Sequence, residues 1–198
     1  MGDLHLAAGR LLAERLGGPS VFPPFPAELA KIDFRSDLNW PTSTGADRYR
    51  RGLYTFFKRT LPHPNLTTFD CPQADSTAVE RARSNTPLHA LLTLNNEVFV
   101  EAARAFAARV LRHDGPGGDH QRMTLAFRMA LTRPPTEWER SRLLGLLAEY
   151  RDWYAQHPDD ARELARDEHA GTGDPADAAA WTETVSVILN LDEFITRE

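Results

Sequence analysis

Arginine is the residue type in this sequence whose number and spacing indicate a possible binding site. Two groups of basic residues flank a long loop, and the second group lies just before a helix start at Asn85 and Thr86. Guanidinium groups beside a helix N-terminus, where unpaired N–H groups point outward, form a common site for phosphate, sulfate or carboxylate groups. We therefore hypothesise an anion or ligand site that comprises Arg48, Arg50, Arg51, Lys58, Arg59, Arg81, Arg83, Asn85 and Thr86.

The same arginines could instead serve the structure. Acidic side chains are plentiful nearby, at Asp47, Asp70, Asp75 and Glu80. Arginine forms bidentate pairs with carboxylates, and such pairs would hold the long loop before Thr86 against the helices. The abundance of nearby acids favours this structural role, and the anion site is the alternative.

No other motif supports catalysis or metal binding. The seven histidines are scattered, and none forms the H-E-x-x-H or H-x-x-x-H pair that places two ligands on one helix face. The single cysteine, Cys71, excludes an internal disulfide, a four-cysteine metal site and C-x-x-C-H haem attachment. Adjacent acids such as Asp192 and Glu193 do not face one another on a helix. We therefore predict no catalytic residue, no metal ligand and no cofactor within this chain.

Four aromatic residues near the middle of the second half could stack on sugar rings: Trp138, Tyr150, Trp153 and Tyr154. They recur at helical spacing within an amphipathic pattern, which is more typical of residues that pack into a core. We expect them to be buried.

Composition limits the class of protein. The 198 residues carry a net charge of −5, and 41% of them are hydrophobic, which is typical of a folded domain. Phosphate binding needs a dominant positive field, so nucleic acid is not an expected partner. No run of 18 apolar residues predicts a membrane span, and the first 18 residues lack the pattern of a signal peptide.

The first third of the chain predicts one helix, a strap and a second helix. Apolar residues at helical spacing predict a helix over residues 3–16, ended by Gly17 and Gly18. Prolines predict an extended strap and loop over residues 19–45, with Phe22 and Phe25 anchored in the core. The stretch DRYRRGLYTFFKRT, residues 47–60, has its apolar residues on one helical face, and a strand is the weaker alternative.

The rest of the chain predicts further helices with readable starts. Thr86 is an N-cap before Pro87, Asn96 caps the next helix, and Thr136 with Glu139 forms a capping box. The last helix begins at Asp174-Pro175. The apolar stripes of these helices comprise Phe99, Ala103, Phe106, Val110, Met123, Ala126, Phe127, Ala130, Leu131, Trp181, Val185, Ile188 and Leu189. We predict a mainly α, orthogonal multi-helix domain that spans residues 1–198, with long proline-rich loops and little or no sheet.

Six phrases in a fixed order carry a resemblance over almost the whole chain: GGPSVFPP, WPTSTGADRYRRGLYTFFKRT, FDCPQADSTAVERARSNTPLHALLTLNN, FVEAARAFAARVL, AFRMALTRPPTEWE and AAWTETVSVILNLDEFITRE. Together they resemble the planctomycete-type, cytochrome-associated C-terminal domain of unknown function, shortened at its N-terminal side. The resemblance implies a c-type haem domain upstream in family members, which are exported to the periplasm or cell surface. Cys71 and His89 depart from the family pattern, which has alanine and glutamine there.

The residues and the resemblance together predict a non-catalytic binding or protein-interaction module of a cell-envelope protein. Its expected partners are the upstream domains of the full-length protein or other envelope proteins, with an anionic or glycan ligand as a further possibility. One alternative is part of a glycan-directed hydrolase whose active site is completed by residues outside this chain. Another is a structural cap that holds the upstream domain through the first helix and the strap.

Overall fold

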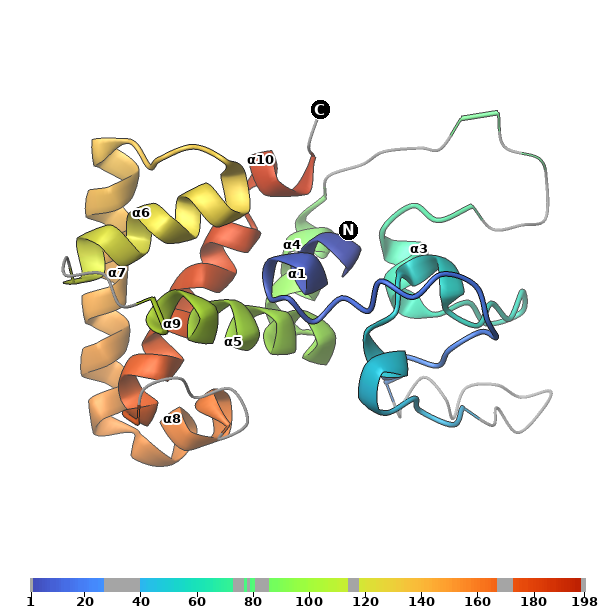
Figure 1. Ribbon diagram of the computed structural model, residues 1–198, viewed down its shortest axis with the longest axis horizontal. Coiled ribbons are helices and arrows are strands. Elements are labelled where there is room, and N and C mark those ends of the chain that lie inside the picture. Colours follow the sequence, from blue (N-terminus) through green and yellow to red (C-terminus); the bar gives the residue numbers. More distant parts are fainter. Residues whose placement is uncertain are drawn as a thin grey trace.

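The protein is mainly helical. The structure, a computed structural model, describes residues 2–26, 40–72, 77, 79–80, 86–113, 118–166 and 173–196. Within these ranges 65% of the residues are helical and no strand is present, as the sequence predicts. Figure 1 shows α5 to α9 gathered in one half of the molecule, while the other half is mostly irregular chain around α3.

Helix α9 lies at the centre of the helical half. The elements are α1 (Gly2–Ala8), the 3-10 helices η1 (Gly45–Tyr49) and η2 (Gly52–Tyr54), α3 (Pro64–Thr68), α4 (Pro87–Asn95), α5 (Glu97–Leu111), α6 (Gly118–Leu131), α7 (Glu137–Gln156), α8 (Pro158–Ala165), α9 (Pro175–Leu189) and α10 (Asp192–Ile195). Helix α9 packs against α5, α7 and α8, and its side chains Trp181, Val185 and Ile188 are fully buried. None of the described helices is long and apolar enough to cross a membrane.

The predicted helix starts are confirmed. Asn96 accepts a hydrogen bond at 3.1 Å from the backbone N–H of Val98 and begins α5. At the start of α7, Thr136 Oγ1 accepts from the Glu139 N–H at 3.2 Å, and Glu139 Oε2 accepts from the Thr136 N–H at 2.7 Å. These contacts join residues that are close in the sequence, so the residue types alone are sufficient to predict them. The predicted apolar stripes of α5, α6 and α9 are all buried.

The first helix is shorter than predicted. It ends at Ala8, because Arg10 adopts a left-handed backbone (φ 57°) and the Leu11 N–H bonds back to the Leu6 carbonyl at 2.8 Å. This is the Schellman arrangement that closes a helix, with arginine where glycine is usual. Glycine occupies the preceding position, since a Cβ at Gly9 would lie 2.8 Å from the Ala102 carbonyl oxygen of α5. The close packing of α1 on α5 therefore uses the glycine.

The predicted helix over residues 47–60 is wrong. The segment forms only η1 and η2, then runs extended beside the first part of the chain. The Val21 N–H bonds to the Tyr54 carbonyl and the Phe56 N–H bonds to the Val21 carbonyl, both at 2.8 Å. These two bonds form an isolated bridge between Val21 and Thr55, which is too short to count as a strand. The segment thus pairs with the strap and does not form the hydrogen bonds of a helix.

The proline-rich strap is held by a small aromatic cluster. Phe22 stacks on Phe56 with ring centroids 5.0 Å apart, and Phe25 lies 4.9 Å from the ring of Trp40. The Trp40 Nε1–H donates to the Pro23 carbonyl at 2.7 Å. The predicted anchoring of Phe22 and Phe25 is therefore found, although both rings are half-buried in this cluster and lie outside the main core.

Candidate functional site

The first three arginines of the predicted anion site, Arg48, Arg50 and Arg51, all form hydrogen bonds or ion pairs within the protein. Arg48 Nη2 lies 2.8 Å from Glu97 Oε1 and 2.7 Å from Glu101 Oε1, and the hydrogen bonds to Glu101 raise the pKa of Arg48 further above its usual range. Arg51 Nε lies 3.3 Å from Asp3 Oδ2. These pairs have the structural character expected from the sequence, but their acids lie on α1 and α5, not among the acids predicted nearby.

Arg50 is buried without a carboxylate partner among the described residues. Only 4% of the residue is exposed, and its guanidinium stacks over the ring of Tyr54 at 3.7 Å. It donates to the carbonyls of Arg15 and Pro19 at 3.1 Å and of Gly17 at 2.5 Å. Three carbonyls that no helix or strand uses are thereby satisfied. Arg50 therefore fixes the turn that leads into the strap.

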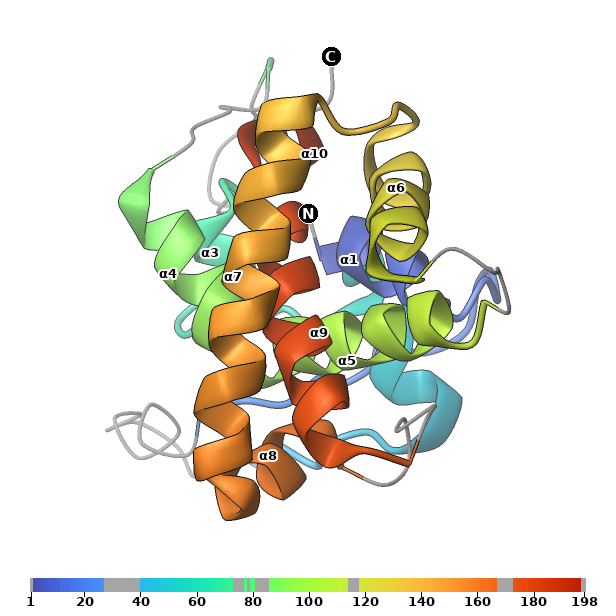
Figure 2. The ribbon, with the colours of Figure 1, turned by 90° about the vertical axis from the view of Figure 1, so that its left-hand side faces the viewer.

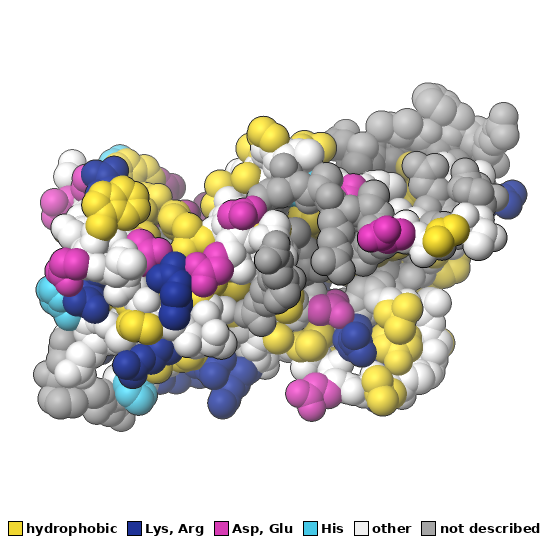
Figure 3. All heavy atoms as spheres, turned by 90° about the horizontal axis from the view of Figure 1, so that it is seen from above, with side chains coloured by type: hydrophobic (Ala, Val, Ile, Leu, Met, Phe, Trp, Pro, Cys, Tyr) yellow, Lys and Arg dark blue, Asp and Glu magenta, His cyan; other side chains and the backbone are white. Residues whose placement is uncertain are grey.

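The remaining members of the predicted anion site are less informative. Arg59 and Thr86 are exposed, Lys58 is half-buried, and Arg81, Arg83 and Asn85 lie outside the described residues. Figure 3 shows basic, acidic and hydrophobic side chains interleaved over the described part of the upper face, without a continuous basic patch there. The anion site stays a prediction.

Two buried histidines connect helix starts to distant carbonyl groups; the sequence places His89 in the cap of its helix, whereas the cap role of His63 and both distant contacts were missed. His63 Nδ1 accepts from the Asn65 N–H at 3.2 Å at the start of α3, and His89 Nδ1 accepts from the Thr86 N–H at 3.4 Å at the start of α4. Each Nε2 then meets a distant carbonyl, that of Pro24 for His63 and that of Thr68 for His89. Proline one residue after His63 was the available signal, because proline favours the first position of a helix.

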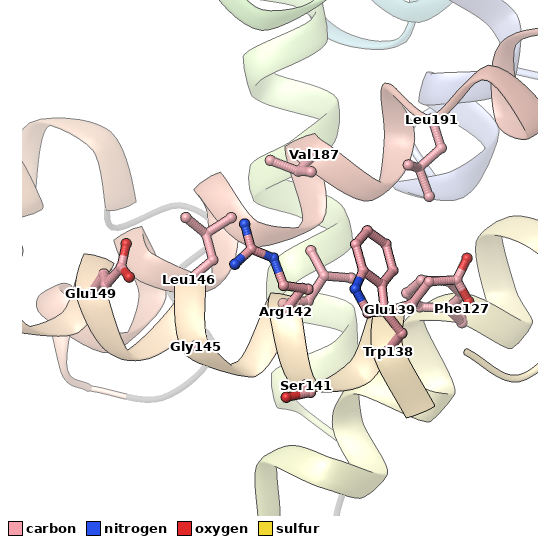
Figure 4. A pocket seen from close by; sticks show the side chains of 11 residues that line it. Phe127, Trp138, Glu139, Ser141, Arg142, Gly145, Leu146, Glu149, Val187 and Leu191 are labelled. Carbon is pink, nitrogen blue, oxygen red and sulfur yellow. The ribbon is translucent and has the colours of Figure 1, made fainter. Parts of the chain in front are cut away.

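An exposed pocket lies between α7 and α9. It has a volume of about 430 Å³ and is lined by Trp138, Arg142, Gly145 and Glu149 of α7, by Val187 of α9 and by Leu191, which lies just before α10. Figure 4 shows the Arg142 side chain between Trp138 and Leu146 on the same side of α7. We refer to this feature as the α7–α9 pocket. A second pocket, of about 420 Å³, is lined by residues that include Arg48, Arg50, Arg51 and Cys71.

The expected burial of the α7 aromatics is only half right. Tyr154 is buried and Tyr150 is half-buried, whereas Trp138 is 73% exposed and Trp153 is 44% exposed. Trp153 stacks on His157 with ring centroids 4.1 Å apart. Trp138 lies in the first turn of α7, in the pocket that Phe127 and Leu191 also line, and most of its surface is open to solvent.

Helix α4 presents leucines to solvent. Leu88, Leu91 and Leu94 are 58%, 60% and 42% exposed, and their spacing of three residues places them on one side of the helix. The opposite side is buried through His89 and Thr93, and Thr93 Oγ1 lies 2.8 Å from Asn190 Oδ1. We call Leu88, Leu91 and Leu94 the α4 leucine face. Figure 2 shows α4 at the left edge of the molecule.

Comparison with known proteins gives one match. Residues 1–147 of the 198 match the family described as protein of unknown function (DUF1553), also called PSD1. The chain belongs to the DUF1553 family. Comparisons with curated proteins and with solved structures gave no match. The matched region of this DUF1553 member includes the α4 leucine face and the first half of α7, while Val187 and Leu191 lie beyond it.

Acid–base chemistry is not supported at Glu139, a carboxylate that lines the α7–α9 pocket. Two bonds from Arg133, at 2.7 and 2.9 Å, and the cap contacts of Thr136 lower the pKa of Glu139 to about 2. A general acid in glycoside hydrolysis needs a raised pKa. Among the described residues of this DUF1553 member, no group of three His, Cys, Asp or Glu side chains could hold a metal ion.

Proposed function

We propose that this member of the DUF1553 family is a non-catalytic protein-interaction module of a cell-envelope protein. The resemblance of its six sequence phrases supports a setting beside a c-type cytochrome or a polysaccharide-processing system. The α4 leucine face supports the mode of action, because it is an apolar surface of a kind that partner proteins cover.

The single observation that carries this proposal is the composition of α4. The helix PLHALLTLN contains no Asp, Glu, Lys or Arg, although 26% of the whole chain is charged. A helix normally buries its apolar side and exposes polar residues to solvent. Here only the side that bears His89 and Thr93 is buried, so Leu88, Leu91 and Leu94 are left for a partner to cover.

The exposed apolar residues favour α4 over the N-terminal strap as the contact surface. Within residues 2–26, Leu16 is the one large hydrophobic residue that is mostly exposed. Leu6 is buried, and Leu4 packs against the main core. A structural cap formed by the first helix and the strap would need an apolar patch there. The observation therefore supports an interaction through α4.

A binding measurement with matched variants tests the proposal. The purified upstream domains of a complete family protein would be titrated with this chain and with the triple variant Leu88→Gln, Leu91→Gln, Leu94→Gln. Glutamine keeps the helix propensity close to that of leucine, so the helix is retained while apolar area is lost. We expect at least a tenfold weaker dissociation constant, since tenfold corresponds to only about 1.4 kcal/mol.

The control removes exposed leucines elsewhere. Leu16→Gln and Leu53→Gln change two residues that are more exposed than any leucine of α4. They should leave the dissociation constant within about twofold. Equal binding by the triple variant and the unchanged chain would contradict the proposal.

A further inference from the structure

Trp138 is an aromatic ring that faces solvent at one end of the α7–α9 pocket. The floor beneath it is apolar, because Phe127 and Leu143 are buried there. An exposed indole above an apolar floor offers a flat surface of the kind that binding sites use for planar or ring-shaped ligands. The polar residues that line the pocket decide which ligand class fits.

Arg142 supplies a free positive charge beside this ring. It lies one turn after Trp138, so both side chains share one face of α7, as Figure 4 shows. Glu139 is the nearest acid on the preceding turn, but its carboxylate is taken by Arg133 and Thr136. Among the described residues Arg142 has no ion pair or hydrogen-bond partner. Its guanidinium can therefore donate two hydrogen bonds to one carboxylate in bidentate geometry.

Gly145 leaves the backbone of α7 bare in the same pocket. A Cβ at this position would meet no atom within 4 Å, so nothing in the fold requires glycine there. Glycine in a helix interior is less stable than alanine, so Gly145 costs stability that no contact within the fold offsets. Because it has no side chain, Gly145 leaves room in the pocket for a ring to approach the backbone of α7.

Glu149 lines the other end of the pocket. From Trp138 to Glu149 the helix rises roughly 16 Å at about 1.5 Å per residue, which is longer than one sugar ring. A carboxylate accepts hydrogen bonds from hydroxyl groups and repels a second carboxylate. The pocket thus combines a stacking surface, one cation and, at a distance, one hydroxyl acceptor.

We propose that the α7–α9 pocket binds an oligosaccharide of neutral sugars that carries one uronic acid. The uronic acid ring stacks on Trp138, and its carboxylate pairs with Arg142. A neutral ring lies over Gly145, and its hydroxyls donate to Glu149. The site does not include the α4 leucine face, so this proposal goes beyond the proposed protein interaction. A negative result for sugar binding would not contradict the protein interaction, and the reverse also holds.

Calorimetric titration with a matched pair of sugars tests the site. Aldotetraouronic acid is a xylotriose that bears one glucuronic acid, and xylotriose is the same chain without the acid. We expect the acidic sugar to bind at least tenfold more tightly. Trp138→Ala should weaken its binding at least tenfold, and Arg142→Gln should abolish the preference for the acid. Trp153→Ala, which changes the exposed tryptophan at the other end of α7, should leave binding within about twofold.

Gly145→Ala separates binding from stability. The added methyl should raise the Tm by about 2–4 °C through helix propensity. It should also weaken binding of aldotetraouronic acid at least fivefold, because it fills the space under the neutral ring. Equal affinity for the two sugars, binding of neither at millimolar concentration, or a preference that survives Arg142→Gln would each overturn the assignment.

Discussion

Two buried histidines each form hydrogen bonds both to a helix start and to a carbonyl group that is distant in the sequence. In both His63 and His89, Nδ1 accepts an N–H at a helix start, so the proton must sit on Nε2, which donates to a carbonyl. Glutamine in place of His89 would complete the same capping box. The sequence shows the cap positions, but the second partner of each ring lies 39 or 21 residues away. Such distant partners cannot be predicted from local spacing.

His63 predicts a loss of stability in mild acid. Burial lowers the pKa of His63 below 6.5, so the unfolded chain binds a proton before the folded chain does. The contribution of His63 is complete above pH 6.5 and is lost as pH falls, by at most about 1.4 kcal/mol per pH unit. Urea unfolding at pH 7.5 and 5.5 measures it. The variant His63→Gln should show a smaller loss between these two values, and an identical loss in both proteins would contradict this role.

The contacts of Arg50 predict that lysine at this position would not preserve stability. A lysine ammonium cannot reach three carbonyls in fork geometry or stack flat on Tyr54. Arg50→Lys should lower the free energy of unfolding by about 1–3 kcal/mol, because buried acceptors lose their donors. Arg51→Lys is the matched control, since its pair with Asp3 is partly exposed and should change stability by less than about 1 kcal/mol. Comparable losses in urea unfolding for the two variants would argue against the buried fork.

At the scale of elements, predictions from local signals were correct, and the prediction for a segment with competing tertiary contacts was wrong. The capping residues Thr136, Asn96 and Asp174 begin α7, α5 and α9, as the sequence predicts, because each cap bonds within its own turn. The segment 47–60 has helical spacing, yet its backbone pairs with Val21 and its arginines reach the turn before the strap and helices α1 and α5. Tertiary contacts thus outweigh a periodicity that is correct in itself.

The surroundings of Gly9 and Gly145 predict that substitution by alanine has opposite effects on stability at the two positions. A Cβ at Gly9 would lie 2.8 Å from the Ala102 carbonyl oxygen, whereas a Cβ at Gly145 would meet nothing within 4 Å. Gly9→Ala should lower the free energy of unfolding by about 1–3 kcal/mol, because α1 must move away from α5. Gly145→Ala should raise it by about 0.5–1 kcal/mol. Thermal and urea unfolding of the pair decide the matter, and a neutral Gly9→Ala would show that α1 does not pack as described.

At the scale of the whole molecule, the sequence predicts the helical class but not the surfaces. The apolar stripes show which side of each helix is inward, but the central position of α9 among α5, α7 and α8 was not predicted from its sequence. Exposure of Trp138 was missed because periodicity shows which side of a helix a residue lies on, but not whether a neighbouring element covers that side. The α4 leucine face could have been found, since PLHALLTLN lacks any charged residue.

The most direct test of the interaction module is amide hydrogen exchange over α4. The exchange rates of residues 88–94 would be measured in this chain alone and in its complex with the purified upstream domains of a complete family protein. Burial of the leucine face should slow exchange in α4 by at least tenfold, while exposed α8 serves as the internal reference and should not change. A complex that forms with unchanged exchange in α4 would contradict the account.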